Sequence, residues 1–201
     1  MTILSVPQHL IVIADSILGA IWAVDVETAN YSILLQEPEM APPPPTAARA
    51  LSLGINRVRV LTQGPDEVYI YFDNTNAHLF CRVPLCLSTR AKTGPVEILA
   101  NLTSQGLTTD DFALDPQHDI AYLACQQNQI LRVPLGGGDV VSVLGGLNQT
   151  VVEGPTSVAV GRGCWCEGSI YVTTNGGLQM PVNGTYTEGW KVVAVDTTGL
   201  R

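Results

Sequence analysis

Two adjacent carboxylates, Asp110 and Asp111, are the side chains of this sequence that could most directly do chemistry. A carboxylate beside a bound substrate can act as a general base that directs water. Carboxylates are also preferred ligands of hard cations such as calcium. The structural alternative is a turn pair that caps the entry of a strand, because Asp is a favoured turn residue. The residues by themselves leave both interpretations open.

Other arrangements that carry chemistry are missing from the sequence. It contains no Gly-x-Ser-x-Gly elbow and no glycine-rich nucleotide-binding motif. Cys164 and Cys166 flank a tryptophan, but no second cysteine pair or histidine cluster has the spacing of a zinc site. The chain has 5 cysteines, so at least one thiol is unpaired within it. We expect neither a nucleotide site nor a structural zinc site.

The composition limits the classes of protein to which the chain can belong. Of the 201 residues, 46% are hydrophobic and only 14% are charged, which excludes a disordered chain. The net charge of −8 argues against a nucleic-acid partner. No apolar run reaches the roughly 18 residues that a membrane span requires, so we expect no membrane partner.

Glycosylation sequons and the start of the chain point in opposite directions. Asn-x-Ser/Thr occurs at four positions, where composition alone would give roughly one. These are Asn30, Asn101, Asn148 and Asn183. They suggest a secretory history, yet residues 1–9 show no signal peptide. Localisation therefore stays open, and a start codon later than the ancestral one would reconcile the two observations.

Apolar alternation divides the chain into four similar repeats of about 50 residues. The second strands match best, with LIVIADS, VYIYFDN, IAYLACQ and SIYVTTN, and RVPL occurs twice, at 82–85 and 132–135. The expected strands are 2–6, 10–14, 20–26, 31–36, 55–61, 68–72, 78–85, 96–100, 111–114, 120–124, 129–135, 140–144, 156–160, 169–173 and 191–196.

Four strands in each of the first three repeats, and three in the fourth, indicate the blades of a β-propeller. We expect a single all-β, partial propeller domain over 1–201, with four-stranded antiparallel blades at about 1–36, 55–101, 108–146 and 154–198. A β-sandwich is the alternative, but it would not explain verbatim repeats at matched positions. If the blades are equivalent, a set of polar side chains faces one mouth: Asp15, Ser16, Asp73, Asn74, Gln126, Ser157 and Asn175. We assign substrate binding to Asp15, Asn74, Ser157 and Asn175.

Several motifs resemble one known family. They are residues 10–32, GIN at 54–56, VYIYFDNT at 68–75, DDFALD at 110–115, GPTSVAVG at 154–161 and IYVTTNGG at 170–177. Their order and spacing are similar to those of the six-bladed propellers of regucalcin, gluconolactonase and strictosidine synthase, in the fungal branch. The resemblance covers nearly the whole chain and corresponds to the last four of six blades, the C-terminal two-thirds of the ring.

The resemblance implies a divalent cation, with calcium the expected ion. By motif, Asn56 and Asp110 match two ligands of the family, and Asp110 with Asp111 would be catalytic. The family usually has Gly after that Asn, where this chain has Arg57. The family's ligand Glu and a second Asn would lie upstream of Met1, so the resemblance suggests an N-terminally truncated chain. If the site is incomplete, we expect no cofactor.

Three functions remain open for such a chain. The first is a gluconolactonase-like hydrolase of a small-molecule lactone in fungal secondary metabolism, assisted by a divalent metal. The second is a non-hydrolytic cyclase of natural-product biosynthesis, of the hetero-Diels–Alder type, with the propeller mouth as an orienting cavity. The third is an inactive truncated homologue. A homodimer is a further open alternative, because two copies would give eight blades.

Overall fold

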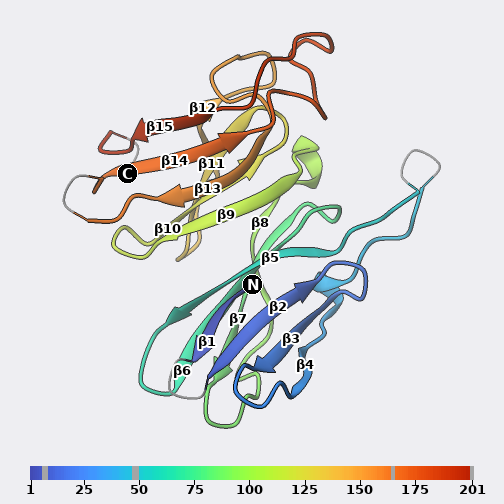
Figure 1. The fold of residues 1–201 in the computed structure, drawn as a ribbon, viewed down its shortest axis with the longest axis vertical. Helices are drawn as coiled ribbons and strands as arrows, with labels where there is room; N and C mark the ends of the chain where they lie inside the picture. Colours follow the sequence, from blue (N-terminus) through green and yellow to red (C-terminus); the bar gives the residue numbers. More distant parts are fainter. Residues whose placement is uncertain (6–8, 47–49, 164–165, 200–201) are drawn as a thin grey trace. The chain divides into compact units, whose positions relative to one another are not determined.

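The structure, a computed structural model, describes residues 1–5, 9–46, 50–163 and 166–199. The chain is all-β, with four antiparallel sheets that form the blades of a β-propeller (Figure 1). The propeller prediction is therefore confirmed. The chain divides into two compact units, Met1–Ser104 and Gln105–Arg201, and each is described separately below.

The first unit holds two four-stranded sheets. In each sheet the strands pair in sequence order, so every strand forms an antiparallel hairpin with the next. The first sheet contains β1 (Thr2–Ser5), β2 (Leu10–Asp15), β3 (Ala20–Asp25) and β4 (Tyr31–Leu35). The second contains β5 (Ile55–Thr62), β6 (Glu67–Asn74), β7 (Leu79–Cys86) and β8 (Glu97–Asn101). A short 3-10 turn, η1 (Pro38–Met40), lies in the connection between the two sheets.

The second unit holds one four-stranded and one three-stranded sheet. The four-stranded sheet contains β9 (Thr109–Asp115), β10 (Ile120–Cys125), β11 (Gln129–Pro134) and β12 (Val141–Gly145). The three-stranded sheet contains β13 (Pro155–Val160), β14 (Ser169–Thr174) and β15 (Val192–Asp196). A second 3-10 turn, η2 (Thr103–Gln105), lies between β8 and β9. Residues Val6, Cys164 and Trp165, which the expected strand 2–6 and the cysteine pair include, lie outside the described residues.

Burial explains the largely apolar sequences of the second strands in the second and third repeats. All six residues of β10 are buried, and the last five residues of β6 are buried as well. A strand that is covered on both faces selects β-branched, aromatic and small apolar residues at every position. The outer strands β4 and β12 are largely exposed and tolerate polar residues. In the described part of the chain, no helix has the length and apolar character needed to cross a bilayer.

Candidate functional site

The first strands of three sheets carry a β-bulge at the same place. In β5, residues Asn56 and Arg57 lie opposite one residue of β6, because the register shifts between Ile55 and Val58. In β9 the shift falls at Asp110, between Thr109 and Asp111. In β13 it falls at Thr156, between Pro155 and Ser157. The three strands can thus be superposed residue by residue on their bulges.

These bulges change the direction of the side chains beside them relative to a regular strand. A bulge inserts one unpaired residue, bends its strand and re-aims the side chains beside it, and bulges are common next to active sites. Asn56, Asp110 and Thr156 occupy equivalent positions, and the residues after them are Arg57, Asp111 and Ser157. The two residues that sequence motifs assign to a cation, Asn56 and Asp110, are therefore bulge residues.

In the second unit the bulges of neighbouring blades meet. Strands β9 and β13 lie side by side (Figure 1), and the Ser157 hydroxyl donates a hydrogen bond to Oδ2 of Asp111. The Asp111 side chain is buried, with a residue exposure of 2%, and its Oδ1 accepts the Phe112 amide at 2.9 Å. Asp110 is half-buried. The structure thus joins a predicted catalytic residue, Asp111, to a predicted substrate-binding residue, Ser157.

The predicted cation ligands belong to different units, Asn56 to the first and Asp110 to the second. Calcium requires six to eight oxygen ligands. Within the described ranges, no group of three or more His, Cys, Asp or Glu side chains is arranged to hold a metal ion. The assignment of Asn56 and Asp110 to a cation stays a prediction.

Asp15 lies at the end of β2 and closes the turn to β3. Its Oδ1 accepts the backbone amides of Leu18 at 2.9 Å and Ile17 at 3.1 Å, and its Oδ2 accepts the Trp22 indole at 3.4 Å. The Leu18 amide and these other donors hold the pKa of Asp15 below its ordinary value. Asp15 is thus an ionised turn residue whose oxygens already have protein partners.

Asn74 holds the connection that contains η1. Its side chain is fully buried, and its Nδ2 donates to the carbonyls of Ala41 at 2.8 Å and Glu39 at 2.9 Å. Its Oδ1 accepts the Ala77 amide at 3.0 Å. The two donated bonds use both hydrogens of the amide, so Asn74 could donate to a substrate only if one of them were replaced.

Asn175 closes the turn that follows β14. Its Oδ1 accepts the amides of Gly177 at 3.0 Å and Leu178 at 3.1 Å. The same oxygen approaches Gly154, where a Cβ would lie only 2.0 Å from it and where φ is +58°. Glycine is therefore required at 154, immediately before β13. Asn175 thus packs against the start of the strand that carries Ser157.

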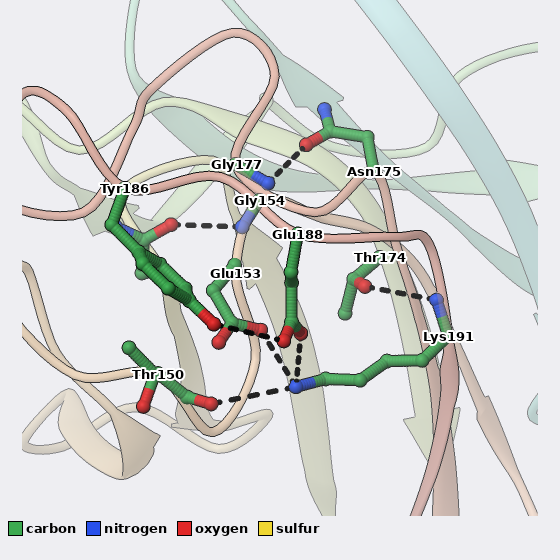
Figure 2. A network of polar contacts seen from close by, with 10 residues as sticks. Thr150, Glu153, Gly154, Thr174, Asn175, Gly177, Tyr186, Glu188 and Lys191 are labelled. Carbon is green, nitrogen blue, oxygen red and sulfur yellow. Dashed lines mark hydrogen bonds and ion pairs between the residues drawn. The ribbon is translucent and has the colours of Figure 1, made fainter.

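A polar cluster that sequence reasoning missed surrounds the start of β13 (Figure 2). The Lys191 Nζ lies 2.7 Å from Oε2 of Glu153 and 2.5 Å from Oε1 of Glu188. It also donates to the Thr150 carbonyl at 3.4 Å, and the Tyr186 hydroxyl donates to Oε2 of Glu188 at 3.3 Å. The Glu153 side chain is fully buried. We call Glu153, Glu188 and Lys191 the carboxylate–lysine cluster.

The charged groups of the carboxylate–lysine cluster stabilise one another's charged forms. The hydrogen bond that Lys191 donates is the main cause that lowers the pKa of Glu188. Burial lowers the pKa of Lys191, but its bonds to Glu153 and Glu188 outweigh burial and leave that pKa above its ordinary value. The negative charge of Glu188 raises the pKa of Tyr186. The ammonium and the Glu188 carboxylate thus both stay charged at neutral pH.

Backbone bonds attach residues 175–191 to the start of β13. The Asn175 amide donates to the Gly154 carbonyl at 2.9 Å, and the Gly177 amide donates to the Glu153 carbonyl at 3.1 Å. The chain turns back at Gly176, where φ is +71° and a Cβ would lie 2.0 Å from the Glu188 carbonyl oxygen. The sequence contains one signal for this cluster, which is the unusual length of the connection between β14 and β15. The other blades have short turns between their second and third strands.

We predict that acid weakens the second unit through Glu188. A carboxylate whose folded pKa lies below its unfolded value stabilises the fold above the unfolded pKa, and this stabilisation disappears as the pH falls through the folded pKa. The ordinary value for Glu188 is 4.5, so the loss should begin as the pH falls through that value. Urea unfolding at several pH values measures it. In Glu188→Gln the slope of stability against pH should be smaller; an unchanged slope would contradict the assignment.

Comparisons with known proteins give the fold. No model of a protein family matches the chain, and no curated protein matches it. Among solved structures, a luciferin-regenerating enzyme matches with a TM-score of 0.57 at 12% identity, over 87% of this chain and 51% of that one. The calcium-binding protein regucalcin from Agrobacterium tumefaciens matches with a TM-score of 0.55 at 18% identity, over 83% and 50%.

A third structure, a nidogen–laminin complex, matches with a TM-score of 0.51 at 14% identity, over 83% of this chain and 52% of that one. The chain therefore spans about half the length of the solved chains that it matches. Identities this low are informative about architecture and not about activity. The chain has a β-propeller fold like that of regucalcin and the luciferin-regenerating enzyme.

Proposed function

We propose that this chain is part of a gluconolactonase-like enzyme that hydrolyses a small-molecule lactone in fungal secondary metabolism with the help of a divalent cation. The observation that supports the proposal is the pairing of Asp111 with Ser157 beside the half-buried Asp110, at matched bulges of neighbouring blades. A regucalcin-like fold and the sequence motifs that resemble lactonases support the same reading.

Hydrolysis of a lactone requires a base near the attacking water. Water adds to the lactone carbonyl, the ring C–O bond breaks, and the product is a hydroxy acid. In our proposal Asp110 accepts the water proton, which then passes to the alkoxide that leaves the ring. Asp111 is buried and is hydrogen-bonded to Ser157, so it supports the bulge.

Lactone hydrolysis by the full product of the gene tests the proposal. A panel of sugar, aliphatic and aromatic lactones would be followed by acid release at constant pH, first with calcium and then with EDTA. We expect saturable hydrolysis that EDTA abolishes and calcium restores. Absence of hydrolysis across the panel with calcium present would argue for the inactive homologue instead.

A non-hydrolytic cyclase is the second candidate, and one observation favours it. The connection 175–191 carries exposed apolar side chains, with Trp190 83% and Leu178 76% exposed. Exposed aromatic side chains can orient an apolar polyene substrate without any base. Product formation that persists in EDTA and falls in Trp190→Ala would select the cyclase over the hydrolase.

A further inference from the structure

The asparagines of this chain form two groups, those in sequons and those outside them, and the two groups differ in exposure. Four of the nine lie in Asn-x-Ser/Thr sequons, and all four are exposed. The other five lie outside sequons, and each is buried or half-buried. The sequon group is Asn30, Asn101, Asn148 and Asn183, and the other group is Asn56, Asn74, Asn76, Asn128 and Asn175.

Each sequon asparagine lies at a strand end or in a connection between strands. Asn30 precedes β4, Asn101 ends β8, Asn148 follows β12, and Asn183 lies in a turn between β14 and β15. There is one sequon for each of the four sheets. The hydroxyl residues of the sequons, Ser32, Thr103, Thr150 and Thr185, are exposed as well. An enzyme that must engage both the amide and the hydroxyl can therefore reach every sequon.

Asparagines outside the sequons make hydrogen bonds within the fold that a glycan on the side chain would prevent. Asn128 is fully buried, donates to the Leu147 carbonyl at 3.1 Å and accepts the Gly154 amide at 2.8 Å. Asn74 is buried with three backbone bonds. A bulky solubilising glycan needs a surface amide. The sequons thus coincide with the positions that can accept one.

We propose that this chain is N-glycosylated at Asn30, Asn101, Asn148 and Asn183. The donor is an oligosaccharide linked to a lipid diphosphate, and an oligosaccharyltransferase is the catalyst. The bond between the anomeric carbon and the diphosphate oxygen breaks, a bond from that carbon to the asparagine Nδ2 forms, and the lipid diphosphate leaves. The amide nitrogen gives up one proton to the medium, and nothing is oxidised or reduced.

The buried thiols are compatible with the oxidising compartment in which such transfer occurs. Cys81 and Cys125 are fully buried, and burial raises the pKa of Cys81 to about 12. The thiolate is the reactive form of cysteine, so Cys81 remains an inert thiol. The proposal does not depend on lactone hydrolysis, because it concerns surface positions and not the bulge residues.

Mass spectrometry of the protein purified from the organism that makes it tests the proposal. Peptide N-glycosidase in water labelled with oxygen-18 converts each glycosylated asparagine to a labelled aspartate. We expect the label at positions 30, 101, 148 and 183 and a fall in apparent mass on a gel. Label at none of them would overturn the proposal, and an unlabelled sequon would overturn it for that position.

Matched substitutions in a eukaryotic host separate glycosylation from folding. Thr185→Ala removes a sequon but keeps Asn183, and it should remove one glycan; Thr103→Ala should do the same for Asn101. Thr185→Ser preserves the sequon and should keep the glycan. An equal glycan number in Thr185→Ala and Thr185→Ser would overturn the assignment of Asn183.

Discussion

Replacing Lys191 by methionine should lower the free energy of unfolding by about 3 kcal/mol. Lys191 is the counter-ion of the fully buried Glu153 and of Glu188. Methionine keeps most of the apolar stem and removes the ammonium, so the Glu153 carboxylate would stay buried without its ion pair. A buried charge that loses its partner costs several kcal/mol. Urea unfolding followed by circular dichroism measures the difference.

Two further variants make this result specific. In Glu153→Met/Lys191→Met the buried Glu153 charge is removed with that of Lys191, and only the partly exposed Glu188 loses its partner. The double variant should therefore recover most of the loss, because an apolar pair of similar volume often replaces a buried ion pair without penalty. Lys92→Met removes the Lys92–Glu37 pair, whose N–O distance of 2.8 Å is similar and whose lysine is about as exposed as Lys191, but whose carboxylate is 19% exposed where that of Glu153 is 0% exposed. That control should cost about 1 kcal/mol or less. Equal losses in Lys191→Met and Lys92→Met would contradict the role of burial.

Sequence alone was sufficient for the blades because their signal is local. VYIYFDN of β6 and IAYLACQ of β10 are β-branched and aromatic because these strands are buried on both faces. RVPL recurs because β7 and β11 are the third strands of their sheets, with a buried valine and a partly exposed arginine in each. Each of these patterns depends on residues that are close in the sequence. The alternation of apolar and polar residues reflects such local structure.

The site was only partly predictable, since it depends on register and on the path of a long connection. A bulge is defined by how a strand pairs with its neighbour, so the residues around Asp110 do not by themselves show that this residue is the inserted one. Sequence motifs pointed to Asp110, Asp111 and Ser157 individually, but the bond between Asp111 and Ser157 needed the pairing of two strands from different blades.

The carboxylate–lysine cluster could not be found from spacing. Glu153 and Lys191 are separated by all of β13, β14 and the connection 175–191. Their meeting depends on the left-handed turn at Gly176 and on the backbone bond from Gly177 to Glu153. A sequence shows that such a connection is rich in turn residues but does not show where it returns.

Replacing Asp110 by asparagine should lower kcat for lactone hydrolysis by at least about 100-fold. Asparagine keeps the shape and polarity of the side chain at the bulge of β9 but cannot accept a proton from water. The substrate still meets the same surface, so KM should change much less than kcat. A pH-stat assay of the full gene product with calcium present gives both constants.

Asp139→Asn is the matched control for this substitution, because Asp139 is exposed in the connection between β11 and β12 and loses the same charge. It should retain full activity. A loss of kcat in Asp110→Asn together with a lower free energy of unfolding would mean that the carboxylate supports the bulge rather than the chemistry, so both quantities are measured on each variant. If Asp110→Asn hydrolyses lactone as fast as Asp139→Asn, Asp110 is not the base, and Asp111, whose carboxylate is held by Ser157, becomes the residue to replace next.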